Sequence, residues 1–136
     1  MKFETTITIN ASTDKIFALY KDVNNWKKWD PEIKESFIDS EFKEGTTGFL
    51  KPLSGPKSKF VLTKVLQNKS FTAKTTLPFC SIYFERKLIP NSSSTKVVHR
   101  IVFDGLLAPL FGRLLGNKLK EEQLRTMEAL KKETEK

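Results

Sequence analysis

Apolar and polar residues alternate with a period of two along most of this chain, which is the pattern of half-buried β-strands. The alternation first covers residues 2–9, and it resumes at residue 33 with turn-forming residues at short intervals. The pattern predicts six further strands, at residues 33–42, 47–52, 58–66, 70–77, 80–89 and 96–104. Strands joined by such short links form an antiparallel meander, because parallel strands need long crossovers.

Helical spacing appears between the first two predicted strands and again at the end of the chain. Residues 16–20 carry an apolar stripe that predicts a short helix, and residues 26–29 predict a second short helix that ends before Pro31. Residues 106–135 predict one long C-terminal helix, and the proline and glycines in its first half predict a bend or a break there. The combination predicts an α+β protein.

One face of the long helix carries small and polar residues where it should cover the sheet. This stripe contains Gly112, Gly116, Gln123 and Thr126. A close-packed core would have large apolar side chains at such positions, so the stripe predicts space between helix and sheet. An enclosed apolar space is the usual site for a small-molecule ligand. The sequence therefore predicts a cavity for a hydrophobic small molecule.

Length and composition narrow the class of protein. The 136 residues predict a single domain, 1–136. The chain has neither an apolar run of about 18 residues nor an N-terminal signal, which predicts a cytoplasmic protein. Cys80 is the only cysteine, so an internal disulfide and a cysteine metal cluster are excluded, and we expect Cys80 to behave as a small hydrophobe.

The positive charge of the chain favours no specific nucleic-acid partner. The net charge is +8, but lysines outnumber arginines 20 to 4 and are scattered singly, whereas phosphate recognition favours arginine. Between Glu44 and Glu85 there are six lysines and no acidic residue. The simpler interpretation is a solvated surface that keeps sheet edges from associating. The alternative is an anionic partner, including weak contact with an anionic membrane. The sequence is compatible with a monomer or a dimer.

Arg86 and His99 are the candidate polar groups of the cavity. His99 is the only histidine, and it shares strand parity with Ile101, so it should face inward. Closing the last hairpin places Arg86 opposite it, and the two could anchor a ligand carboxylate. The alternatives are that both reach water at the end of the hairpin, or that Arg86 forms an ion pair. The acidic residues considered for that pair are Asp39, Glu41 and Glu122.

Three segments and the order of the elements resemble a known family. Residues 9–17 are Ile-Asn-Ala-Ser-Thr-Asp-Lys-Ile-Phe, residues 23–31 contain the pattern Trp-x-x-Trp-x-Pro, and residues 103–110 contain Phe-x-Gly-x-x-x-Pro-Leu. In this order they resemble the START-like superfamily, also called SRPBCC, which includes the polyketide cyclase/dehydratase and lipid-transport group. Its members include lipid and sterol carriers, hormone receptors, aromatase/cyclases and chaperone cofactors.

The resemblance implies a helix-grip fold. In this fold a seven-stranded antiparallel sheet curls around a long C-terminal helix, two short helices lie between the first two strands, and a cavity separates sheet and helix. It implies no universal catalytic motif, and we expect no catalytic residue, metal or cofactor. An oxygenase with iron held by two histidines is excluded by the single histidine. The expected ligand-binding residues are Trp29, Phe60, Leu62, Phe71, Ile82, Phe84, Arg86, His99, Ile101, Phe103, Leu119, Gln123 and Met127.

Three functions remain open at this point. We favour a noncatalytic binder or carrier of a hydrophobic small molecule, such as a lipid, a fatty acid or a polyketide-like aromatic. The first alternative is a polyketide cyclase/dehydratase-like enzyme that uses Arg86 and His99 to polarise a carbonyl. The second alternative is a protein- or membrane-docking module that uses the lysine-rich strands and the apolar segment 106–115.

Overall fold

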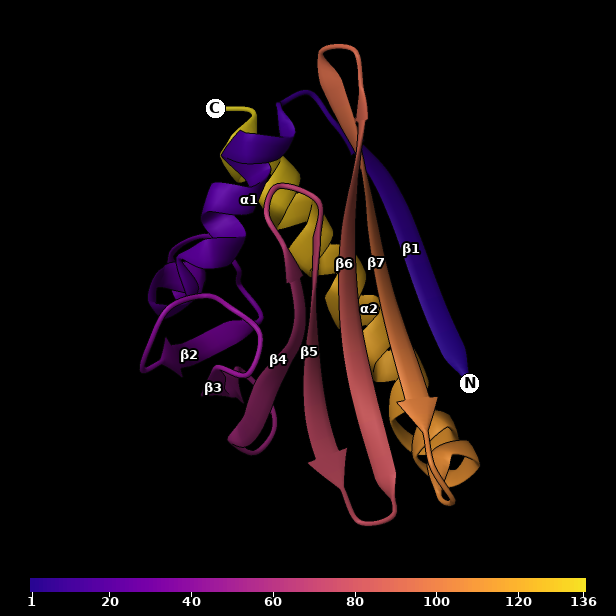
Figure 1. The fold of residues 1–136 in the computed structure, drawn as a ribbon. Coiled ribbons are helices and arrows are strands. Elements are labelled where there is room, and N and C mark those ends of the chain that lie inside the picture. The colour runs from indigo at the N-terminus through magenta and orange to yellow at the C-terminus, as the bar shows by residue number, and fades with distance from the viewer.

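Seven strands form one antiparallel sheet in the computed structural model, which describes residues 1–136. The elements are β1 (Lys2–Ile9), α1 (Thr13–Lys21), the 3-10 helix η1 (Val23–Lys28), β2 (Ile33–Ile38), β3 (Thr47–Pro52), β4 (Ser58–Leu66), β5 (Ser70–Leu77), β6 (Cys80–Asn91), β7 (Ser94–Asp104) and α2 (Ala108–Thr134). The strand order is β1-β7-β6-β5-β4-β3-β2 (Figure 1). The predicted α+β fold, with a meander, two short helices and a long last helix, is confirmed.

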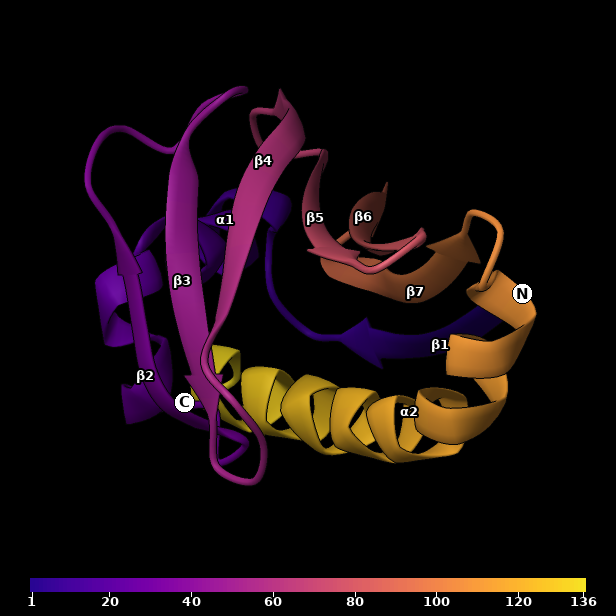
Figure 2. The same cartoon turned by 90° about the horizontal axis from the view of Figure 1, so that it is seen from below.

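The sheet curls around α2. Figure 2 shows α2 crossing the concave side, with β1 directly against it and β2, β3 and β4 rising beyond its C-terminal half. The helix is continuous from Ala108 to Thr134, so a break in its first half is wrong, whereas Figure 2 shows its first turns inclined to the rest, which agrees with the predicted bend. Pro109 lies in the first turn, where the helix needs no N–H donor, and the glycines of the helix keep φ negative.

The second strand is shorter than the predicted 33–42, because the chain turns after Ile38. Thr46 donates from its hydroxyl to the carbonyl of Glu41 over 2.6 Å, which stabilises a loop. This loop brings Phe42 into the core, where its ring lies 5.9 Å from Phe17 and 5.1 Å from Phe71. The edge-to-face packing of this ring against Phe17 and Phe71 stabilises the turn.

The last hairpin is longer than predicted, because β6 extends to Asn91 and β7 begins at Ser94. Proline lacks a strand donor and is tolerated where one side of the strand is free. Pro90 meets this condition, since β5 pairs with β6 only as far as Lys87 and leaves β7 as the sole partner beyond it.

Two side chains from the start of the chain fill the gap beside the first half of α2. A Cβ atom at Gly112 would collide with the side chain of Met1, and one at Gly116 would collide with the ring of Phe3. Phe3 in turn lies edge-on to Phe103, with 6.0 Å between ring centroids. We call this region, made of Met1, Phe3, Gly112 and Gly116, the filled end. The expectation that these two glycines leave space is therefore wrong, because β1 occupies it.

Most of the surface features singled out from the sequence lie outside the concave side, although Leu115, at the end of the segment 106–115, faces it. Several apolar residues near the start of α2 and in the β5–β6 turn are exposed, among them Leu106 at 81% and Phe79 at 72%. Lys57 lies 3.8 Å from the ring centre of Phe49, and Lys74 lies over the ring of Tyr83. None of the helices combines the length and the apolar character that crossing a bilayer requires. A docking role for these surfaces stays a prediction.

A cavity between the sheet and the last helix

A cavity of about 320 Å³ lies between the concave side of the sheet and α2. Its sheet wall includes apolar side chains from four consecutive strands, among them Phe60, Phe71, Ile82, Phe84 and Ile101. Its helix wall begins with Leu115 and Leu119 and continues with the polar residues Glu122, Gln123 and Thr126. We call the segment of α2 from Leu119 to Thr126 the open end, since its inner residues line this cavity.

Most of the predicted ligand-binding residues line this cavity. The nine that do are Trp29, Phe60, Phe71, Ile82, Phe84, Arg86, Ile101, Leu119 and Gln123. The other four do not: Leu62, His99, Phe103 and Met127 are at most 2% exposed and belong to the core behind the wall. Strand parity places a residue on the concave side, but it does not tell whether another side chain covers it.

His99 is covered by Tyr20. The register pairs His99 with Arg86 across β6 and β7, as predicted. However, the Tyr20 hydroxyl lies 2.8 Å from Nε2 of His99, both residues are buried, and Tyr20 rather than His99 lines the cavity. Burial, reinforced by the charge of Arg86, lowers the pKa of His99 well below 6.5, and burial raises the pKa of Tyr20. The imidazole is therefore neutral and cannot serve as a cationic anchor for a carboxylate.

Arg86 lines the cavity without a carboxylate partner. No ion pair within 4.0 Å involves it, so none of the predicted pairs with Asp39, Glu41 or Glu122 forms. Its only hydrogen bond runs from Nη1 to the carbonyl of Glu85 over 3.4 Å. Burial lowers the pKa of Arg86 to about 10, and the nearby Tyr20 and Asp30 oppose that effect, so the guanidinium stays charged at neutral pH.

Asp30 is a buried carboxyl that the sequence reasoning missed. It is 3% exposed and accepts hydrogen bonds from the hydroxyl of Thr126, over 3.0 and 3.1 Å, and from the backbone N–H of Glu32 over 3.0 Å. Burial raises the pKa of Asp30, while these hydrogen bonds oppose the shift. The bonds join the turn before β2 to α2 at one side of the cavity. The one available signal was the position of Thr126 on the inner stripe of α2.

Charged residues of α2 hold two loops of the sheet at the rim of the cavity. Arg125 forms an ion pair with Glu32, close to the start of β2. Lys118 donates to the carbonyl of Ser54, in the β3–β4 loop, over 3.3 Å and lies 4.0 Å from Glu122. Burial raises the pKa of Glu122, although Lys118 opposes it. These contacts place the β3–β4 loop against the helix.

Gln123 presents an unsatisfied acceptor at the cavity. Its Nε2 donates to the hydroxyl of Thr5 on β1 over 3.3 Å, while its Oε1 is buried and has no hydrogen-bond partner. The residue is 4% exposed and belongs to the cavity wall. A buried acceptor without a partner is costly, so a ligand that donates a hydrogen bond here would recover free energy.

Both tryptophans of the chain line the cavity. Trp26 stacks between Phe60 and Phe71, at 6.4 and 6.5 Å between ring centroids, and donates from Nε1 to the carbonyl of Tyr20 over 3.1 Å. Trp29, which the sequence analysis selected, lies one turn further along. Cys80 is buried at the far end of β6, and burial raises the pKa of its thiol, so it stays protonated.

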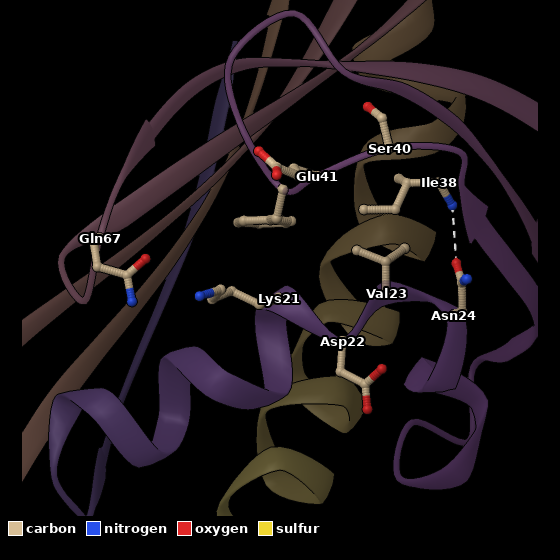
Figure 3. A pocket seen from close by; sticks show the side chains of 9 residues that line it. Lys21, Asp22, Val23, Asn24, Ile38, Ser40, Glu41 and Gln67 are labelled. Carbon is tan, nitrogen blue, oxygen red and sulfur yellow. Dashed lines mark hydrogen bonds between the residues drawn. The ribbon is translucent and has the colours of Figure 1, made fainter.

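A second hollow opens on the outside of the molecule. Its volume is about 460 Å³, and it lies between the end of α1 and the loop after β2 (Figure 3). Six of its nine lining residues are exposed. One hydrogen bond joins two of the lining residues, from the N–H of Ile38 to Asn24 Oδ1 over 3.0 Å. Exposed polar walls cannot desolvate an apolar ligand, so the inner cavity is the better candidate site.

Known proteins give this arrangement a family context. The family model described as polyketide cyclase / dehydrase and lipid transport matches residues 1–135. The fold is similar to the Zhui aromatase/cyclase from Streptomyces sp. R1128 (TM-score 0.79, 16% identity, 99% of this chain and 93% of that chain). It is also similar to Ara h 8.0201 (TM-score 0.77, 14% identity, 98% of this chain and 97% of that chain). A third similar structure is a START superfamily protein from Mycobacterium smegmatis (TM-score 0.73, 17% identity, 97% of this chain and 97% of that chain). No curated protein sequence matches the chain.

Proposed function

Because the chain belongs to the polyketide cyclase/dehydrase and lipid transport family, we propose that it binds a hydrophobic small molecule in the cavity between the sheet and α2. Family and fold support ligand binding or a cyclase-like function. The observation that carries the proposal is the cavity itself, with aromatic and aliphatic side chains on four strands facing a helix that does not fill the space.

The size of the cavity sets the size of the ligand. Its volume is about 320 Å³, whereas an apolar cavity of about 150 Å³ takes up benzene. The space therefore suits a molecule about twice as large, such as two fused aromatic rings or a chain of medium length. Burying such a body between Phe84, Ile101 and Leu119 removes apolar surface from water, which drives binding at roughly 25 cal/mol per Å² before the cost of association.

A cyclase-like enzyme is the second candidate function, and Arg86 is the observation that favours it. A guanidinium in an apolar cavity can polarise a carbonyl group of a bound substrate. His99 is a poor partner for that chemistry, because its Nε2 is bonded to Tyr20 and it lies outside the cavity wall. On an identified substrate, His99→Ala should therefore keep its activity while Arg86→Met loses it.

Calorimetric titration with 2-naphthol, a neutral two-ring probe, tests the binding proposal. The wild-type protein should bind the probe at one site, and the fluorescence of Trp26 and Trp29 should change with the same midpoint, since both tryptophans line the cavity. Ala73→Phe should abolish binding, because Ala73 lies on the cavity wall in β5 and the new ring would occupy the space.

Leu119→Trp is a second blocking variant, placed on the helix rather than on the sheet. Leu124→Trp is the matched control, since Leu124 is 42% exposed on α2 and does not line the cavity. It should bind the probe like the wild type. Absence of binding by a folded wild-type protein, or unchanged binding by both blocking variants, would refute the proposal.

A further inference from the structure

The charged side chains that line the cavity differ in how many ion-pair and hydrogen-bond partners the protein gives them. Three carboxylates line it, and each has a partner from the protein: Asp30 accepts from Thr126 and a backbone N–H, Glu32 pairs with Arg125, and Glu122 lies beside Lys118. The ammonium group of Lys118 pairs with the carboxylate of Glu122 and donates a hydrogen bond to the carbonyl of Ser54.

Arg86 is the one charge on this wall that has neither an ion pair nor more than one long hydrogen bond. A guanidinium offers five N–H donors in a fixed fork, which matches the two oxygens of a carboxylate. An arginine held in an apolar cavity with most donors unused is costly to the free protein. A bound anion would supply the missing counter-charge.

The polar and apolar parts of the cavity are separated along its length. Arg86 pairs in register with Phe71 on one side and His99 on the other, and the buried carboxyl of Asp30 is close enough to act on its charge. Towards the β5–β6 turn, the same strand presents Phe84 and Ile82, which are apolar. On α2, Leu119 and Leu115 continue this apolar half opposite them. The cavity thus has a charged end and a hydrophobic end.

We propose that the ligand is an amphipathic organic anion, with a carboxylate paired to Arg86 and an apolar body lying along Phe84, Ile82 and Leu119. This inference rests on the proposed function, because it needs a small molecule in the cavity. It adds the chemical class of that molecule. A hydroxyl or amide N–H on the body could also donate to the unpartnered Oε1 of Gln123.

The test compares 2-naphthoate with 2-naphthamide, two probes of nearly equal size that differ in charge. Calorimetry at pH 7.5 should show the wild type binding the carboxylate at least about tenfold more tightly than the amide, the size expected for a charge-assisted pair. Arg86→Met should weaken naphthoate binding by at least about tenfold and change naphthamide binding by no more than about twofold. Arg86→Lys should retain part of the preference, as a single cation without the fork.

Arg100→Met is the matched control, since Arg100 lies on β7, pairs with Glu85 and does not line the cavity. It should bind both probes as the wild type does. Arg86→Met should also melt at the same or a higher temperature than the wild type, because it removes an unpaired charge; a marked fall would indicate that Arg86 is a structural residue instead.

The outcomes separate this inference from the function on which it rests. Equal binding of the two probes by the wild type, or equal weakening of both by Arg86→Met, would overturn the anion assignment while leaving an apolar binding protein. If the wild type binds neither probe and also fails to bind 2-naphthol, the proposed function itself falls. The probe comparison on the wild type alone decides the matter even if a variant does not fold.

Discussion

Two segments of α2 face the same sheet, yet the filled end is packed with side chains and the open end borders a cavity. At the filled end, Gly112 and Gly116 are buried against Met1 and Phe3, with no room for a Cβ atom. At the open end, from Leu119 to Thr126, the helix faces a cavity of about 320 Å³. The segment with the two glycines is thus the segment without space.

The difference shows that helix residues alone do not make a cavity. Glycines let the sheet approach or let a neighbouring side chain enter, and at the filled end β1 supplies Phe3 for that purpose. At the open end the sheet curls away, because β2, β3 and β4 rise beyond the C-terminal half of the helix (Figure 2). Curvature of the sheet, rather than small residues, creates the space.

The largest effect on the free energy of unfolding should come from changing side-chain size at the filled end. Gly116→Leu should lower the free energy of unfolding by about 3 kcal/mol, since its side chain would meet the ring of Phe3. Phe3→Ala should cost a similar amount by leaving a void. The double variant should recover more than half of the summed loss, because the leucine would enter the vacated space. Urea unfolding of all four proteins measures this; strictly additive losses would show that the two residues do not share one space.

Acid should weaken the fold through His99. The unfolded imidazole has its ordinary pKa of 6.5, whereas burial and the charge of Arg86 hold the native pKa well below that value. Below pH 6.5 the unfolded chain therefore binds a proton that the native protein does not bind. The free energy of unfolding should fall as the pH falls, by up to about 2 kcal/mol between pH 7 and pH 5.

His99→Gln isolates this effect, because an amide can still bond to Tyr20 but does not titrate. The buried carboxyls Asp30 and Glu122, whose pKa values are raised, act with the opposite sign in both proteins and cancel in the difference. Urea unfolding at pH 7 and pH 5 gives the comparison. An equal pH dependence in wild type and His99→Gln would contradict the assignment.

Adding volume to the cavity from the sheet side should cost little. Ala73→Leu places extra methyl groups into the cavity, and it should leave the free energy of unfolding unchanged or raise it by about 1 kcal/mol. This is the same kind of enlargement that should be destabilising at Gly116. Urea unfolding measures both. A loss of 2 kcal/mol or more at Ala73 would mean that the side chains around it leave no usable space.

The smallest effect on stability should come from the contact at the rim. Lys118→Met removes the link to Ser54 and Glu122, and it should change the free energy of unfolding by less than about 0.5 kcal/mol. It should nevertheless speed the release of 2-naphthol, because the β3–β4 loop loses its contact with α2. Stopped-flow fluorescence measures the release rate. Lys120→Met, at an exposed position of the same helix, should leave the rate unchanged.

The sequence predicted the fold better than the site. Period-two alternation and turn residues located every strand, because those signals act locally; residues 47–52, 58–66 and 70–77 became strands with the predicted bounds. The loop after Ile38 was missed because Phe42 packs against Phe17 and Phe71, which are distant in sequence. Long-range packing of this kind overrides the local pattern.

For the site, strand parity identified much of the cavity wall but could not distinguish the wall from the core behind it. His99 and Arg86 share the concave face, yet Tyr20 from α1 covers only the first of them. The contact between Asp30 and Thr126 joins residues 96 positions apart; the inner stripe of α2 indicated that Thr126 faces the sheet, but nothing local named Asp30 as its partner. Contacts between elements that are remote in sequence thus decide which inward-facing residues line the cavity and which are covered.

A crystal structure of the protein grown with 2-naphthoate tests the central claim most directly. Electron density for the two rings should appear between Phe84 and Leu119, with the carboxylate directed at Arg86 and α2 in its present position. A saturated protein whose probe lies elsewhere, with side chains of the sheet and α2 closed over the cavity, would contradict the claim that this space is a binding site.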